Sequence, residues 1–225
     1  MKNSLKIITF YNNLEKVYSP NNINILDPYS DTKVQKIYKK FYRNYFHDTR
    51  RRIIIFGINP GRFGGGITGI PFTDPYNLTK KCKIKNDFNQ KKELSSTFIY
   101  EMIDKFGGPE NFYNKFLISS ICPYGFTMNN KNLNYYDNEI LFRRWKPKIV
   151  DWIENQIEHI VTDKVCIIIG LGKNQKFFDL LNKEYKFFSE IIALPHPRWI
   201  LQYRSKQKED YIRQYIQTLK NIDYE

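Results

Sequence analysis

The sequence predicts an α/β fold, in which a three-layer α/β/α sandwich is built around a mostly parallel four-stranded central sheet. Three observations lead to this prediction. Short apolar segments alternate with longer segments of helical periodicity, several of the apolar segments have no polar face, and glycine- or proline-rich stretches follow them. A chain of 225 residues can form such a fold as one unit, so we expect a single domain over residues 1–225.

Four segments have the character of buried strands. Residues 51–56 and 165–169 are rich in isoleucine, and residues 116–121 and 187–194 are also strongly apolar. Strands that helices cover on both faces lose the usual alternation of apolar and polar residues. These four segments are therefore expected to form the central sheet.

Helical periodicity lies between and around these strands. The segments that show it are residues 32–47, 91–106, 137–160 and 205–222, and a further helix is expected directly after Gly172. We expect the helix over 137–160 to be interrupted near Pro147, because proline has no N–H to donate.

The ligand crevice of a parallel sheet lies beyond the carboxyl ends of its strands. Residues 57–75, 122–127 and 195–204 leave those ends, and we expect the first and the last of them to be loops. The functional side chains are therefore expected in these three segments.

The charge of the chain narrows the choice of partner. The 36 Lys and Arg residues outnumber the 23 Asp and Glu residues, which gives a formal net charge of +13. Such an excess indicates a polyanionic partner, either nucleic acid or an anionic membrane surface. A coding bias is the alternative, because alanine occurs once while Lys, Asn, Ile, Tyr and Phe abound. Composition leaves both interpretations open.

Composition also excludes several classes of protein. A chain that is 41% hydrophobic and 16% aromatic is not intrinsically disordered. No apolar run approaches the ~20 residues that span a bilayer, and residues 1–11 lack the features of a signal peptide. The cysteines, Cys82, Cys122 and Cys166, have no metal-ligand spacing. We therefore expect a cytoplasmic protein without disulfides. We also expect no metal and no membrane partner.

Glycines are concentrated directly after the first predicted strand. Residues 57–72 hold six of the 11 glycines in the sequence Gly-Ile-Asn-Pro-Gly-Arg-Phe-Gly-Gly-Gly-Ile-Thr-Gly-Ile-Pro-Phe. Such a segment lets the backbone approach a ligand closely, and neither a Walker motif nor a dinucleotide fingerprint is present. A flexible surface loop is the alternative. Asn59 at the strand exit offers an uncharged donor and acceptor for a water, or it caps the turn before Pro60.

A second candidate segment follows the last predicted strand and reads Leu-Pro-His-Pro-Arg-Trp. His196 lies there between two prolines, a rigid setting that suits a site better than those of His47 and His159, which we interpret as structural. Arg198 and Trp199 offer a phosphate contact and a stacking or wedge face. Ordinary packing and solvation are the alternative for both.

The glycine-rich segment resembles the first motif of the uracil-DNA glycosylase superfamily, most closely the bacterial branch of the single-strand-selective monofunctional (SMUG) type. His196-Pro197 resembles the second motif of that superfamily, and the resemblance extends from about Ile25 onward. It implies that Asn59 positions the attacking water and that His196 hydrogen-bonds the water or the leaving base. It implies no metal or cofactor.

The resemblance also implies which residues bind the base. Phe72 matches the aromatic residue that stacks on the flipped base, a contact worth ~1–3 kcal/mol. The Ile58 amide and Gly61 match the backbone that reads the base edge and leaves room beside it. Ser120 departs from the family, because SMUG-type enzymes carry an asparagine there, and its single donor leaves the preferred base open.

Phosphate contacts would help to offset the free energy of flipping a nucleotide out of the helix. The candidates are Arg62, Arg198, Arg204 and Lys206, with Arg198 or Trp199 as the residue that inserts into DNA. We expect a monomer that removes uracil from single- or double-stranded DNA. The alternatives are a glycosylase for xanthine or hypoxanthine, a non-catalytic binder of damaged or single-stranded DNA, and a hydrolase of nucleotides or small metabolites.

Overall fold

The central sheet consists of four strands whose residues are mostly apolar. A computed structural model describes residues 1–20 and 22–222, and within them the larger sheet has the order β3-β2-β6-β7. The strands are β2 (Arg52–Gly57), β3 (Phe116–Ser120), β6 (Val161–Ile169) and β7 (Glu190–Leu194). Every pairing in this sheet is parallel. The predicted α/β class is confirmed, and the sheet is entirely parallel.

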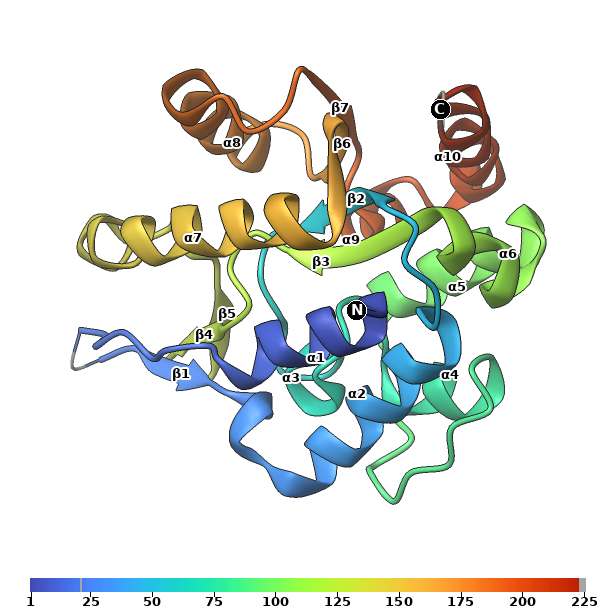
Figure 1. Ribbon diagram of the computed structural model, residues 1–225, viewed down its shortest axis with the longest axis horizontal. Coiled ribbons are helices and arrows are strands. Elements are labelled where there is room, and N and C mark those ends of the chain that lie inside the picture. The colour runs from blue at the N-terminus through green and yellow to red at the C-terminus, as the bar shows by residue number, and fades with distance from the viewer. Residues whose placement is uncertain (21, 223–225) are drawn as a thin grey trace.

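Helices flank this sheet on both sides, which explains why its strands have no polar face. The α6 helix contacts β2 and β3, α7 and α8 contact β6, and α5 packs against α6 and α10. Figure 1 shows α7 and α8 to the left of the strands and α5, α6 and α10 to their right. These helices are α5 (Leu94–Phe106), α6 (Gly108–Lys115), α7 (Glu139–His159), α8 (Lys173–Tyr185) and α10 (Lys208–Asn221).

The predicted interruption at Pro147 is wrong, because α7 runs without a break from Glu139 to His159. A proline inside a helix removes one hydrogen bond and crowds the preceding turn. Packing on both sides of the proline offsets this loss, since Trp145 and Ile149 are completely buried.

The N-terminal residues add two helices, α1 (Asn3–Asn12) and α2 (Thr32–Tyr45), joined through β1 (Asn24–Leu26) and the 3-10 turn η1 (Pro28–Ser30). The α2 helix agrees with the predicted one. The α1 helix was not predicted; it packs against both α2 and α7.

A second, smaller sheet was also not predicted. It is antiparallel, with the order β1-β4-β5, where β4 is Gly125–Met128 and β5 is Lys131–Leu133. Asn129 and Asn130 join β4 to β5 with φ angles of 50° and 59°. Two consecutive positive φ angles are typical of a type I′ hairpin turn, for which asparagine is well suited.

The segments expected to be loops at the carboxyl ends of the strands also contain short helices. Residues 57–75 include α3 (Gly65–Thr68) and lead into α4 (Pro75–Lys80), and residues 195–204 include α9 (Pro197–Tyr203), followed by the 3-10 turn η2 (Ser205–Gln207). The prediction that these two segments are loops is therefore wrong in part. The helix α9 packs against α5 and α10, which fixes the position of the last segment.

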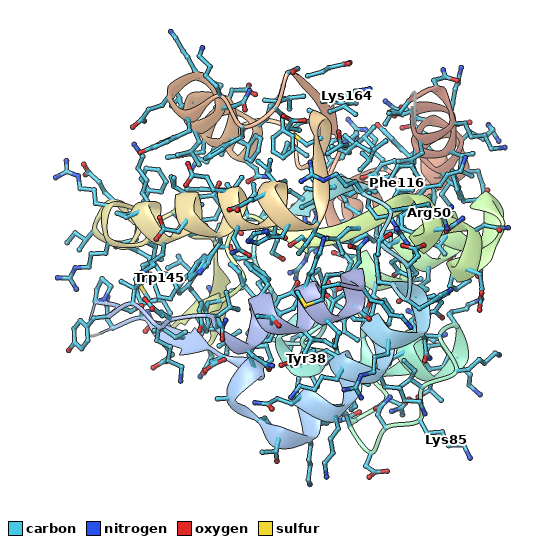
Figure 2. The ribbon with its side chains drawn as sticks, in the orientation of Figure 1. Tyr38, Arg50, Lys85, Phe116, Trp145 and Lys164 are labelled. Carbon is cyan, nitrogen blue, oxygen red and sulfur yellow. The ribbon has the colours of Figure 1, made fainter. Side chains whose placement is uncertain are left out.

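The buried apolar side chains form one contiguous core. Tyr38 of α2 and Trp145 of α7 are completely buried, whereas Lys85 extends into solvent (Figure 2). The three cysteines are buried and unpaired. Within the described residues, every helix is too short or too polar to traverse a lipid bilayer.

Candidate active site

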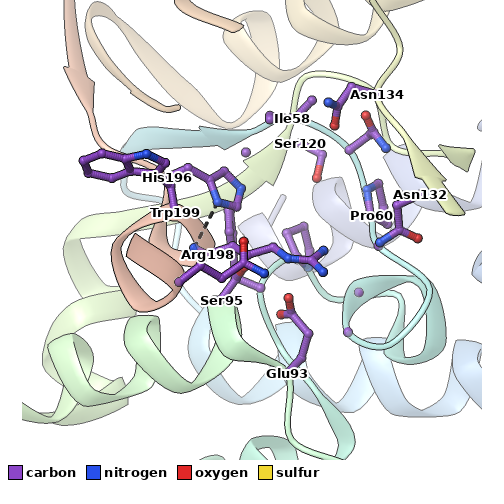
Figure 3. Close-up of a pocket in the computed structure, with 18 of the residues that line it drawn as sticks. Ile58, Pro60, Glu93, Ser95, Ser120, Asn132, Asn134, His196, Arg198 and Trp199 are labelled. Atoms are coloured by element: carbon purple, nitrogen blue, oxygen red, sulfur yellow. Dashed lines mark hydrogen bonds between the residues drawn. The ribbon is translucent and has the colours of Figure 1, made fainter. Parts of the chain in front are cut away.

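A pocket of about 400 Å³ opens at the carboxyl ends of the parallel strands (Figure 3). Eight of the residues expected from the sequence line it together, although they come from segments far apart in the chain. They are Ile58, Asn59, Gly61, Phe72, Ser120, His196, Arg198 and Trp199. The expected meeting of the residues after β2 with those after β7 is therefore observed.

The side chain of Asn59 is held in one orientation by the segment that contains β5. Its Nδ2 donates to the carbonyl of Leu133 at 3.2 Å, and its Oδ1 accepts from the backbone N–H of Tyr135 at 3.1 Å. These two bonds distinguish the oxygen from the nitrogen of the amide. One N–H and one lone pair are left for a water in the pocket. Asn59 therefore fixes the hairpin segment and does not cap the turn before Pro60.

His196 is the N-cap of α9. Its Nδ1 accepts a hydrogen bond from the backbone N–H of Arg198 at 3.1 Å, so the ring proton of the neutral imidazole is on Nε2. Burial of the ring, with a contribution from the positive charge of Arg198, lowers the pKa of His196 to about 4. The Tyr215 hydroxyl donates to the carbonyl of Pro195 and fixes the residue before the histidine. At neutral pH the site therefore holds an uncharged N–H donor.

Phe72 has a φ angle of 53°, in the left-handed region that bulky residues rarely adopt. Its ring lies over Gly57, where an added Cβ atom would be only 2.5 Å from Cε2 of the phenylalanine. The ring centroid is 5.9 Å from that of His196, with the two planes inclined by 48°. Phe72 thus forms an aromatic surface beside the imidazole.

The remaining base-site candidates come from the ends of β2 and β3. Ser120 pairs with Gly57 in the sheet register and is only 5% exposed, and its hydroxyl makes no hydrogen bond to a described residue. The carbonyl of Gly61 accepts from the N–H of Gly66 at 3.0 Å, and an added Cβ atom on Gly61 would lie 3.2 Å from Asn132. Glycine at this position therefore keeps the pocket open beside Asn132.

The DNA-contact candidates separate into two groups. Arg198 and Trp199 line the pocket, and Trp199 is 40% exposed. The guanidinium of Arg204 lies 5.3 Å from the Trp199 ring but does not line the pocket. Arg62 points away, because it hydrogen-bonds the Asn130 carbonyl and lies 4.6 Å from the Phe63 ring. Lys206 is exposed in the η2 turn.

Several lining residues were not singled out in the sequence, although some of them lie in the predicted segments. They are Glu93, Ser95, Asn132, Asn134, Gln202 and Tyr203, together with prolines and glycines of the first loop. Two sequence signals could have found four of them. The Asn129-Asn130 pair favours a hairpin, which brings in Asn132 and Asn134. Pro197 directly after His196 favours a helix start, which brings in Gln202 and Tyr203.

Asn134 differs from its neighbours, because its carboxamide makes no hydrogen bond to any described residue. It is half-buried and lies near Ser120 and Ile58 in Figure 3. Asp74, the aspartate closest in sequence to the glycine-rich segment, has a structural role: it is completely buried and caps α4 through the N–H of Asn77. Among the described residues, no cluster of His, Cys, Asp or Glu could hold a metal ion.

Comparison with known proteins identifies the family of this chain. A family model described as the uracil DNA glycosylase superfamily matches residues 44–220. The chain belongs to this superfamily. It is also similar to the crystal structure of wild-type Pedobacter heparinus SMUG2, with a TM-score of 0.94 and 43% identity over 98% of this chain and 97% of that chain. Comparison with curated proteins gave no match.

Membership of the superfamily makes this chain a DNA glycosylase, and the resemblance to the SMUG type is confirmed. The two segments that carried the resemblance, residues 57–72 and 195–199, both border the pocket. In this glycosylase the pocket combines an oriented carboxamide, a neutral imidazole donor and an aromatic surface. These groups can bind a planar base and stabilise negative charge that develops on it.

Proposed function

We propose that this glycosylase is monofunctional and hydrolyses the N-glycosidic bond of uracil in DNA, as a step of base excision repair. The observation that carries the proposal is that Asn59, Phe72 and His196 line one pocket. An aromatic surface for the base, an amide for the water and a donor for the leaving group are the parts that this reaction requires.

Asn59 is proposed to position the water that attacks C1′ of the sugar. The C1′–N1 bond breaks, its electron pair leaves with the base, and the water oxygen bonds to C1′. The proton that the water loses ends on the departing base. The lone pair and N–H that Asn59 keeps free can orient this water, because its other two sites are bonded to Leu133 and Tyr135.

His196 is proposed to stabilise the leaving base through Nε2–H. The pKa of His196 near 4 keeps the imidazole neutral, so it donates a hydrogen bond to the oxygen where negative charge develops and does not transfer a proton. A preorganised donor at such a position is worth ~3–4 kcal/mol of transition-state stabilisation. The backbone bond to Nδ1 supports this role, because it leaves Nε2 as the protonated nitrogen.

The edge of the base is proposed to contact Ser120 and Asn134, with the Ile58 amide and Gly61 beside it. Both side chains line the pocket and make no hydrogen bond to described residues. The hydroxyl of Ser120 is shorter than a carboxamide and leaves more room in a pocket of about 400 Å³. This observation favours a second candidate activity, the removal of xanthine or hypoxanthine.

Helix α9 is proposed to contact the DNA around the flipped nucleotide. Arg198 can pair with a phosphate, and the exposed Trp199 can insert or stack beside the vacated position. Arg62, Arg204 and Lys206 would act outside the pocket as additional phosphate contacts. No lysine is among the described lining residues, which supports hydrolysis without a Schiff base and therefore without strand cleavage.

The test is base release from oligonucleotides that each carry one uracil, xanthine or hypoxanthine. We expect free uracil from the native protein, and Asn59→Ala and His196→Ala should each lower the rate by at least about tenfold. His47→Ala is the matched control, because His47 is exposed and lies outside the pocket. Salt-dependent binding with no base released from any lesion would contradict the proposal and favour a non-catalytic binder.

A further inference from the structure

The backbone at Phe72 needs an external restraint. Its φ angle of 53° is unfavourable for a bulky side chain, and the side chain is not completely buried. The strained residue therefore depends on its neighbours to hold it. The residues on each side of it are anchored by two threonines.

Thr68 and Thr73 close the chain around Phe72. The Thr68 hydroxyl donates to the carbonyl of Thr73 at 2.6 Å and accepts from the N–H of Ile70 at 3.2 Å. The Thr73 hydroxyl lies 3.2 Å from the carbonyl of Pro71. Both threonines are completely buried, so these bonds are shielded from water. They tie the residues immediately before and after Phe72 to each other.

Tyr100 connects this turn to helix α5. Its hydroxyl lies 2.9 Å from the Thr73 hydroxyl, 3.1 Å from Sγ of Cys82 and 3.3 Å from the Tyr113 hydroxyl. One arrangement of protons satisfies every group: Cys82 and Tyr113 donate to Tyr100, Tyr100 donates to Thr73, and Thr73 donates to Pro71. Burial raises the pKa of Cys82 to about 11, so the thiol keeps the proton that it donates.

The ring of Phe72 lies between two residues that leave room for it. Gly57 has no side chain to displace it, and His196 lies beside it with ring centroids 5.9 Å apart. A rotation of the Phe72 backbone toward an ordinary φ angle would move the ring relative to both residues. Restraint of the backbone therefore restrains the ring.

We propose that Thr68, Thr73 and Tyr100 form a clamp that holds Phe72 in its left-handed conformation, so that its ring is in place before the base arrives. They are positioning residues, since none of the three lines the pocket. The inference rests on the proposed stacking role of Phe72. An aromatic ring that is already in position makes stacking more favourable, because no side chain has to be ordered when the base binds.

The test compares Thr73→Val, which removes the hydroxyl, with Thr73→Ser, which keeps it. Binding is measured to two oligonucleotides of the same sequence, one with 2′-fluoro-2′-deoxyuridine, whose glycosidic bond resists hydrolysis, and one with a tetrahydrofuran abasic analogue. We expect Thr73→Val to weaken binding of the uracil analogue about tenfold, since stacking is impaired, and to leave abasic binding within about twofold. Thr73→Ser keeps the hydroxyl and should bind both oligonucleotides as tightly as the native protein.

Two results would contradict the proposal that these residues hold Phe72 in place. One is unchanged binding of the uracil analogue by folded Thr73→Val, and the other is equal weakening toward both oligonucleotides, which would indicate a general structural defect. If Thr73→Val does not fold, Tyr100→Phe takes its place, with Tyr45→Phe as the matched control near Cys82. Failure of the proposed function is distinguishable, because the native protein would then release no base from ordinary deoxyuridine.

Discussion

The ring centroids of Phe72 and His196 lie 5.9 Å apart, although Phe72 belongs to the segment after β2 and His196 follows β7. In the sheet order β3-β2-β6-β7, β6 separates those two strands. The long glycine-rich segment and the short helix α9 reach across this gap from each side. The site therefore depends on two loops that meet over the sheet, and each can be tested separately.

Asn59→Ala is expected to lower the rate of base release at saturating DNA by at least about tenfold, because the attacking water loses its orientation. The substitution also removes the bonds to Leu133 and Tyr135, so thermal unfolding must be measured in parallel. Asn155→Ala, an exposed change on α7, is the matched control. A native rate in folded Asn59→Ala protein would exclude this role.

The rate of base release should show no inflection near pH 6.5, where an ordinary histidine titrates. The pKa of His196 is about 4, so the neutral donor is fully present above roughly pH 5 and is lost as the pH falls through 4. Protonation would also remove the Nδ1 acceptor of the Arg198 N–H. Single-turnover rates between pH 4 and 8 check this, and an inflection near 6.5 that disappears in His196→Gln would contradict it.

Gly57→Ala is expected to displace the Phe72 ring, because the new methyl group would lie 2.5 Å from Cε2. The rate and the affinity for a uracil analogue should both fall, by about tenfold or more. A double-mutant cycle with Phe72→Ala isolates the contact. If Gly57→Ala has the same effect in the native protein and in Phe72→Ala, the contact with the Phe72 ring is not the cause of that effect.

Arg198→Ala should weaken DNA binding and reduce the slope of log K against log salt by about 1, as loss of one phosphate contact requires. Lys36→Ala is the control, because this exposed lysine lies on α2, outside the pocket. Binding to undamaged oligonucleotide over a range of salt concentrations gives both slopes. Equal slopes for the native and Arg198→Ala proteins would show that Arg198 does not contact a phosphate.

Folding stability should depend on the ion pair of Asp48 with the buried Arg52. Partial burial alone would raise the pKa of Asp48, but hydrogen bonds from Arg52 and Arg50 outweigh it and lower the pKa to about 2. The pair therefore stabilises the fold above pH 4, and this contribution is lost as the pH falls toward 2. Asp48→Asn should destabilise the protein by about 2–3 kcal/mol at pH 7 in denaturant unfolding. A loss below 0.5 kcal/mol would contradict this.

The sequence determined the parts of the fold that depend on local pattern. The continuous apolar runs fixed the strands β2, β3 and β6, because only strands covered on both faces lose their polar side. Helices α2, α5 and α10 were equally visible as apolar stripes of helical period. Pro147 was misleading, because its local preference was outweighed by the burial of Trp145 and Ile149, which cannot be seen in the sequence.

The motif residues of the site were also visible in the sequence. Asn59 and His196 were selected by their position after predicted strands and Phe72 by the resemblance to a glycosylase, which gave all three roles that are still to be tested. Arg62 was selected because it lies near the predicted crevice, but its side chain bonds to the β4–β5 hairpin and points away from the pocket. Position along the chain could not distinguish a side chain that enters the pocket from one that turns away.

Only the tertiary structure decided what surrounds those residues. The β4–β5 hairpin brings Leu133, Asn134 and Tyr135 to Asn59, and the backbone bond at Arg198 selects the tautomer of His196. The first are contacts between segments distant in sequence, and the second depends on the start of helix α9, which was predicted as a loop although Pro197 favours a helix start. A local pattern records which backbone conformation a segment prefers. Hydrogen-bond orientation and proton location depend on partners that only folding brings together.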